Sequence, residues 1–276
     1  MPDTLERENP RIVASTRKKW GESSMDMLEC IEKRRSISAY KATPIPDDVL
    51  EKILDAGRWA PSGANSQPVE LVVIKDSEDR EGIRNLVLEV WQMSGVDSLD
   101  TVFAVMKRSG SLAASGAEIV SWDEYLNAPV MVIVVSDEDK RGQEYEHITY
   151  YTMSSDAGAA TCQNMMLGAY ALGVGSLWLT AIDPERIKYW FGIPRTLGVA
   201  GIVLLGYPRY WSKAPELALN TDPRVYPRRP LEDMVHYETF DNDKWIDYQL
   251  SDPFRLPREE FLRTQNYVRP TKLQGD

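Results

Sequence analysis

The sequence predicts an α+β fold in which helices flank one central sheet. Three apolar runs have the composition of buried strands, at residues 69–74, 130–135 and 199–206. Stretches with apolar residues at helical spacing separate these runs. The chain has 276 residues, of which 43% are hydrophobic, and no change in composition marks a linker between two halves. We therefore expect one globular domain with tails.

Two helices are predicted before the first strand, after a polar arm at residues 1–23. The first helix begins near Ser24 and ends near Arg34, because apolar residues recur at helical spacing up to that point. The second begins at Pro46, followed by acidic residues that favour the positive end of a helix, and stops before Pro61. The apolar stripe of the first helix consists of Met27, Leu28 and Ile31.

Residues 91–128 connect the first two strands and mix aromatic, small and charged side chains without a clean period. Two interpretations stay open for this segment. It is either a surface connection or a lid that forms one wall of a substrate pocket.

A long helix is predicted over residues 155–172, with small residues along one face that would let other helices approach closely. Such a helix is typical of the centre of a domain or of a subunit interface. Gly173 and Gly175 end it and precede a strand-like segment, which is the reverse of the order in a dinucleotide-binding fingerprint. We therefore reject a Rossmann site. A short helix follows at 184–191.

From Tyr207 onward the chain is rich in Pro, Arg and aromatic residues, a composition that favours extended wrapping segments over a second core. The C-terminal extension, residues 239–276, carries several aromatic side chains. We expect this tail to dock on a surface, which could be that of a partner subunit.

The formal net charge is −10 and the sequence pI is about 4.9, which argues against nucleic acid or an anionic membrane as a general partner. Cys30 and Cys162 lie in apolar helical patterns and are predicted to be buried thiols rather than a disulfide. His147 and His236 lack ligand-type spacing, so no metal site is expected. The N-terminus lacks an apolar signal core, and we expect a cytoplasmic protein.

Two arginine pairs stand out in this acidic chain. Arg34 and Arg35 precede Ser36 at the end of the first helix, and Arg228 and Arg229 occur near the end of the chain. Paired guanidinium groups beside a hydroxyl suit a phosphate, because each planar fork matches two phosphate oxygens. An arginine pair can also be an ordinary solvated helix end.

The loop at residues 61–68 supplies neutral hydrogen-bonding groups from Ser62, Asn65 and Gln67. Such groups suit a polar heterocycle, although the same residue types also make a generic turn. Together with the arginine pairs, the loop predicts a phosphorylated, ring-bearing cofactor.

These motifs in this order resemble those of the FMN-dependent nitroreductase family, from about Met25 to Glu238. The resemblance implies a nitroreductase-like fold with a central, mainly antiparallel sheet flanked by helices. It also implies an FMN-binding domain over residues 24–238 and an interlocked homodimer with an FMN in each of two interface sites. The landmarks are residues 34–36, 61–68, 173–180 and 228–236.

The resemblance also assigns roles to residues. Arg34, Arg35, Ser36 and Arg228 would surround the FMN phosphate, with Arg229 beside them, and Ser62, Asn65 and Gln67 would lie against the isoalloxazine ring. Thr180 and Ala181 would present backbone N–H groups to flavin N5. Ser38 departs from the family pattern, which places Arg or Lys there, and Tyr226 stands where some relatives carry Lys.

The implied mechanism is ping-pong hydride transfer from NADH or NADPH to a small acceptor such as a nitroaromatic, quinone, activated alkene or halogenated phenol. Because the flavin performs the redox step, no catalytic acid–base residue is expected. The alternatives are a specialised flavoenzyme, namely a reductive dehalogenase, a flavin-fragmenting enzyme or a natural-product dehydrogenase. A non-catalytic FMN carrier or sensor, or a protein without flavin, are alternatives of other classes.

Overall fold

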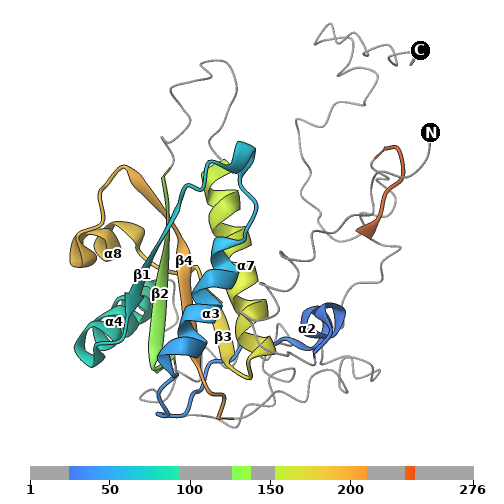
Figure 1. The fold of residues 1–276 in the computed structure, drawn as a ribbon. Helices are drawn as coiled ribbons and strands as arrows, with labels where there is room; N and C mark the ends of the chain where they lie inside the picture. The colour runs from blue at the N-terminus through green and yellow to red at the C-terminus, as the bar shows by residue number, and fades with distance from the viewer. Residues whose placement is uncertain (1–24, 94–125, 138–152, 210–233, 240–276) are drawn as a thin grey trace, which may run out of the picture. The chain divides into compact units, whose positions relative to one another are not determined.

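The structure is a computed structural model that describes residues 25–93, 126–137, 153–209 and 234–239 (Figure 1). The chain divides into two compact units, residues 1–227 and 228–276. In the second unit the structure describes only residues 234–239, so the sheet and the helices belong to the first unit.

One four-stranded sheet forms the centre of this unit. Its strands are β1 (Val69–Ile74), β2 (Val130–Asp137), β3 (Gly175–Leu179) and β4 (Leu197–Gly206), in the order β1-β2-β4-β3. Every neighbouring pair is antiparallel. The predicted strands and the antiparallel α+β sheet are thus confirmed, and β1 and β3 are its edges among the described strands.

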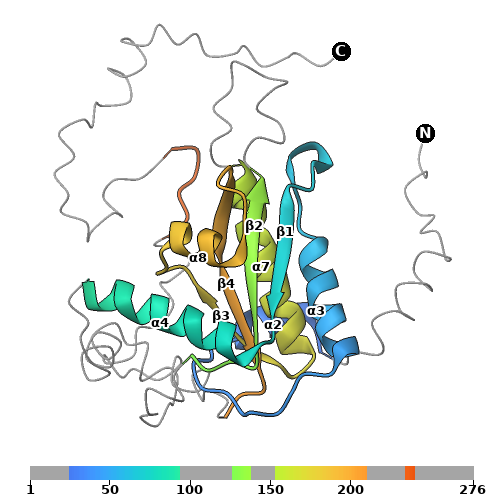
Figure 2. The ribbon, with the colours of Figure 1, turned by 90° about the vertical axis from the view of Figure 1, so that its left-hand side faces the viewer.

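Helices cover both faces of the sheet (Figures 1 and 2). The side chains of β2 alternate between two apolar clusters, which explains why the whole strand from Val130 to Ser136 is buried. On one face the cluster includes residues of α3 (Asp47–Arg58) and α7 (Met153–Ala171). On the other it includes residues of α4 (Ser77–Met93) and α8 (Pro184–Phe191).

Small residues let α7 pack closely on its neighbours, as its sequence predicts. A Cβ atom added at Gly168 would lie 2.9 Å from that of Ala56 on α3. A Cβ added at Gly158 would lie 2.6 Å from that of Ala200 on β4. The helix ends at Ala171, and Gly173 just after it has a φ of 74°.

The first helix, α2 (Met27–Lys33), packs against α7 and is shorter at its start than predicted. Asp26 caps it, because its side chain accepts a hydrogen bond from the backbone N–H of Leu28 at 2.8 Å. Its apolar stripe faces outward. Met27, Leu28 and Ile31 are 69%, 73% and 52% exposed, respectively.

Both cysteines are buried free thiols, as predicted. Burial raises the pKa of Cys162 to about 12, so this thiol stays protonated at neutral pH. No cluster of three potential metal ligands occurs among the described residues. In the same part of the chain, no helix has the length and apolarity needed to span a membrane.

Helix α4 was not predicted from the sequence. Its buried side chains include Ile83, Leu86 and Val87, which recur at helical spacing. Residues 94–125, most of the predicted lid or connection, lie outside the described residues, and so does the predicted tail from 240 onward.

Candidate functional site

The first group of predicted site residues follows α2. Arg34 and Arg35 are half-buried, and Ser36 is exposed. The Arg35 guanidinium donates from Nη1 to the carbonyl oxygens of Glu32 and Arg34, the latter at 2.8 Å, so it also serves as a cap for the helix end. Here the arginine pair combines a structural contact with partly accessible positive charge.

Backbone pairing joins this group to the start of β3. Ser36 forms an isolated parallel bridge with Ser176, and the N–H of Ile37 donates to the Ser176 carbonyl at 2.9 Å. The Ser176 hydroxyl is buried and makes no hydrogen bond within the described part of the chain. Ser176 was not predicted as a site residue, because its proximity to Ser36 arises only from tertiary pairing.

Thr180 and Ala181 follow the other end of β3. Both residues are exposed, and the N–H of Ile182 donates to the Thr180 carbonyl at 2.9 Å, which makes a tight turn centred on Ala181. From Ser176 to Thr180 the chain rises about 13 Å, at the usual rise for an extended strand. The structure therefore places the arginine pair and the Thr180 turn along one strand of the same chain.

The second group of predicted residues lies in the loop that contains η1 (Gly63–Asn65). The Ser62 hydroxyl accepts a hydrogen bond from the Gln67 N–H at 3.0 Å and closes the loop. Ala64, Asn65 and Gln67 have φ values of 44°, 57° and 48°, in the left-handed region that non-glycine residues rarely adopt. Asn65 and Gln67 are exposed, so their amides are accessible.

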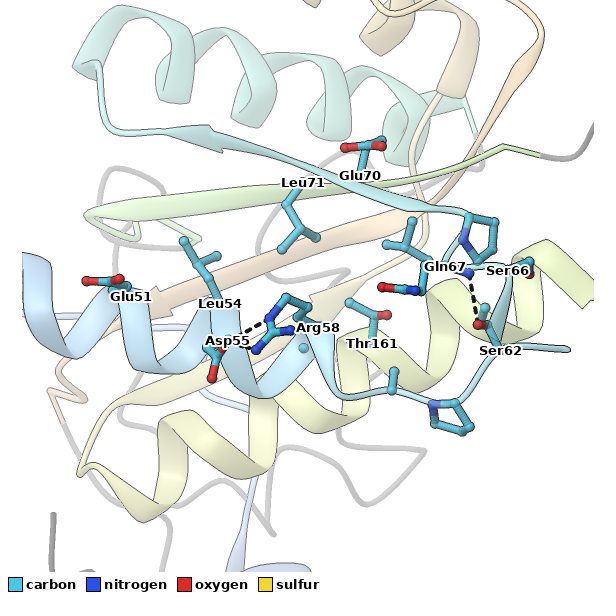
Figure 3. Close-up of a pocket in the computed structure, with 16 residues that line it drawn as sticks. Glu51, Leu54, Asp55, Arg58, Ser62, Ser66, Gln67, Glu70, Leu71 and Thr161 are labelled. Carbon is cyan, nitrogen blue, oxygen red and sulfur yellow. Dashed lines mark hydrogen bonds and ion pairs between the residues drawn. The ribbon is translucent and has the colours of Figure 1, made fainter. Parts of the chain in front are cut away.

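A cleft of about 760 Å³ lies between this loop, α3, β1 and the first half of α7 (Figure 3). Ser62, Ser66 and Gln67 line it on the loop side, and Thr161 lines it from α7. On the α3 wall of the cleft, the Arg58 guanidinium pairs with Asp55 at 2.6 Å. Asp55 and Arg58 were not predicted as site residues from the sequence either.

The two groups lie at opposite ends of α7. The loop shares its cleft with Ala157 and Thr161 near the start of the helix. At the other end, Ser36, which follows the arginine pair, forms a bridge with Ser176, and Ser176 comes shortly after Ala171, the last residue of α7. From Ala157 to Tyr170 an α-helix rises about 20 Å. The structure therefore does not bring the loop and the arginine pair together within one chain (Figure 1).

A sequence model described as "Nitroreductase family" matches residues 31–207, which is well over half of the chain. The chain belongs to the nitroreductase family. The match begins before Arg34 and ends after β4, so it includes every predicted site residue except Arg228 and Arg229. Those two arginines lie outside the described residues.

Individual proteins are also similar to this chain. An NADH dehydrogenase from Thermus thermophilus is 28% identical over 67% of this chain and 87% of its own length. Rat iodotyrosine deiodinase 1 is 26% identical over 72% of this chain and 67% of its own.

Solved structures of the nitroreductase family share the fold. A family member from Clostridium difficile has a TM-score of 0.55 and 28% identity, over 78% of this chain and all of that chain. A nitroreductase with bound FMN from Desulfitobacterium hafniense has a TM-score of 0.52 and 21% identity, over 77% of this chain and 98% of its own.

Proposed function

We propose that this nitroreductase-family chain is an FMN-dependent oxidoreductase that acts as a homodimer with NADH or NADPH as its reductant. The observation that carries the proposal is the arrangement along β3. Half-buried arginines adjoin its first residues, and an exposed turn follows its last residue. A flavin mononucleotide has a phosphate at one end and a ring at the other, which matches these two ends.

The donor set fits the cofactor. Arg34, Arg35 and Ser36 offer charged and neutral donors to a phosphate. Ser176, whose hydroxyl is buried, is the bridge partner of Ser36. Each charge-assisted hydrogen bond would contribute about 1.5–3 kcal/mol to binding. Thr180 and Ala181 would present backbone N–H groups to flavin N5. We propose that Arg228 and Arg229 complete the phosphate site.

Two chains are needed to complete the ring site, because the Ser62–Gln67 loop lies at the far end of α7 from the arginine pair. In the proposed dimer, the loop of one subunit would cover the flavin held by its partner. The outward-facing stripe of α2 supports this assembly. Three large apolar side chains on one short helix favour contact with another subunit.

When bound, FMN would supply the chemistry of two-electron hydride transfer between NADH or NADPH and the acceptor. The chain's own residues hold the phosphate, orient the ring and limit the access of water. Ser38 brings no positive charge to the pyrimidine side of the ring. We therefore expect weaker stabilisation of the anionic reduced flavin than in relatives with Arg or Lys there.

The acceptor class is a small oxidised molecule, such as a nitroaromatic, quinone, activated alkene or halogenated phenol. A second candidate activity is reductive dehalogenation, which the similarity to rat iodotyrosine deiodinase 1 favours. In that reaction the aryl carbon gains hydrogen, the carbon–halogen bond breaks and halide leaves. NAD(P)H supplies the two electrons and is oxidised to NAD(P)+.

The test is anaerobic reduction of the purified protein with NADH and with NADPH, followed by reoxidation with a panel of acceptors. We expect stoichiometric FMN, loss of the oxidised-flavin absorption with at least one nicotinamide, and its recovery with an acceptor. Halide release from a halogenated phenol would identify the dehalogenase. Bound FMN without turnover would instead indicate a carrier or sensor, and protein without FMN would refute the proposal.

A further inference from the structure

The edge strand β3 is fastened to β4 by a tryptophan. The Trp178 indole N–H donates to the Ala200 carbonyl at 3.1 Å. In the sheet, Trp178 stands opposite Val203, so its ring reaches diagonally along β4 toward Gly201 and Ala200. This contact lies two residues before Thr180.

The Ala200 carbonyl that accepts this hydrogen bond lies in a β-bulge. Val134 of β2 pairs with Gly201, and Val135 pairs with Val199, so Ala200 is an extra residue in β4. Gly201 has a φ of 142°, and a side chain there would run into the Trp178 indole and lie 2.8 Å from the Leu179 carbonyl oxygen. The bulge and the glycine together allow Trp178 and the end of β3 to approach β4 closely.

The segment after Trp178 is held at both ends. Leu179 is the last paired residue of β3, opposite Ile202, and the turn over Thr180 and Ile182 follows directly. Asp183 then caps α8, accepting hydrogen bonds from the N–H groups of Glu185 and Arg186. The Trp178 bond fixes the sheet side of this short turn, and the Asp183 cap fixes its helix side.

We propose that Trp178 is a positioning residue that sets the orientation of the flavin-facing N–H groups at Thr180 and Ala181. The inference rests on the proposed function, which places these groups at flavin N5. An N–H donor near N5 favours hydride uptake only when it is held in the direction of that atom. Trp178 thus acts through the turn, without contacting the cofactor.

The test compares two tryptophan-to-phenylalanine variants. Trp178→Phe removes the indole N–H donor together with the five-membered ring and keeps a six-membered aromatic ring. Trp190→Phe is the matched control, because the Trp190 indole also donates one hydrogen bond at 3.1 Å, to Asp79 on the α4 side of the sheet. The first readout is amide hydrogen exchange in peptides covering residues 180–182, and the second is the rate of flavin reduction by saturating NADH or NADPH in a single turnover.

For Trp178→Phe we expect faster exchange at 180–182, unchanged FMN stoichiometry and flavin reduction slower by roughly ten- to hundredfold. The Trp190→Phe control should match the native protein in both readouts. Gly201→Ala should move both readouts in the same direction as Trp178→Phe, because its new methyl group displaces the indole. Unchanged exchange in Trp178→Phe, or faster exchange with normal flavin reduction, would overturn the positioning role.

A failure of the proposed function is distinguishable from a failure of this inference. If the native protein binds no FMN, the proposed function fails, and the exchange measurement still tests the Trp178 contact. If FMN binds and Trp178→Phe behaves as the control does, only the positioning role fails.

Discussion

Near the C-terminal end of α7, the chain offers positive charge from the arginine pair that follows α2. Near the N-terminal end of α7, it offers neutral polar groups on a strained loop. Arg34 and Arg35 follow a regularly capped helix. Ala64, Asn65 and Gln67 all have positive φ. Non-glycine residues in that region cost about 1–3 kcal/mol each, and they persist only where surrounding contacts hold them.

The difference indicates two tasks. A phosphate is bound by charge, which tolerates small displacements, whereas a flat ring needs donors and acceptors fixed in direction. The loop is held by the Ser62 hydroxyl and by Pro68, whose carbonyl accepts from the Asp137 N–H at 2.8 Å. The contrast fits the proposal that the arginine pair of one subunit binds the phosphate and the loop of its partner covers the ring.

The largest effect is expected from removing the charge at the phosphate-binding end. Arg34→Ala with Arg35→Ala should weaken FMN binding at least about hundredfold, because two charge-assisted contacts are lost. A fluorescence titration of the apo protein with FMN measures the affinity. Lys33→Ala is the control, because Lys33 pairs with Glu29 at 2.7 Å and is not a proposed ligand. Native affinity in the double variant would refute the phosphate assignment.

The next effect concerns the assembly of the two ends. Ile31→Glu places a charge in the exposed stripe of α2 and should shift the protein from dimer to monomer, with a large loss of bound FMN. Size-exclusion chromatography with light scattering reports the mass. Tyr189→Glu is the control on α8, where the tyrosine is 91% exposed and should tolerate the charge. If Ile31→Glu remained a dimer, α2 would not be part of the interface.

A smaller effect is expected at the ring-binding end. Ser62→Ala removes the acceptor that holds the Gln67 N–H, which should reduce the free energy of unfolding by about 1 kcal/mol. FMN affinity should fall roughly tenfold as the loop relaxes. Denaturant unfolding and FMN titration give the two values. Ser66→Ala in the same loop should change neither by as much, and equal effects of the two variants would contradict a specific role for Ser62.

The smallest effect is a dependence of stability on pH, from an ion pair at the start of α3. The Lys75 ammonium donates to Asp47 at 2.6 Å and lowers the pKa of that carboxyl below its ordinary 3.8. The resulting stability is present above pH 3.8 and is lost as the pH falls through the lowered pKa. Both side chains are exposed, so the effect should be slight. In acid unfolding, the stability of Asp47→Asn should fall less steeply with decreasing pH than that of the native protein. An acid transition identical to the native one would contradict this contribution.

Local patterns in the sequence predicted much of the fold. The apolar runs of β1, β2 and β4 and the helical spacing of α3 need no tertiary knowledge. Helix α4 was missed although Ile83, Leu86 and Val87 carry the same spacing, because the run of charged residues at 78–81 precedes them and obscured the period.

The site was predictable only in part. The motifs identified the residue types, but the bridge of Ser36 to Ser176 depends on pairing between distant segments. The contact of Trp178 with Ala200 depends on a β-bulge, and although Gly201 inside the apolar run is a local signal for a bulge, it does not identify Trp178 as the contacting residue. Nor does the sequence reveal that the loop and the arginine pair lie at opposite ends of α7.

Mixed dimers test the shared flavin site most directly. One subunit carries Arg34→Ala with Arg35→Ala, the other carries Ser62→Ala with Asn65→Ala, and two affinity tags isolate the mixed dimer. If each flavin is held by the arginines of one chain and the loop of the other, one intact site forms per mixed dimer. We predict one tightly bound FMN in the mixed dimer and none at native affinity in either pure variant. A mixed dimer with no tight FMN would show that each site is built within a single chain and would contradict the account.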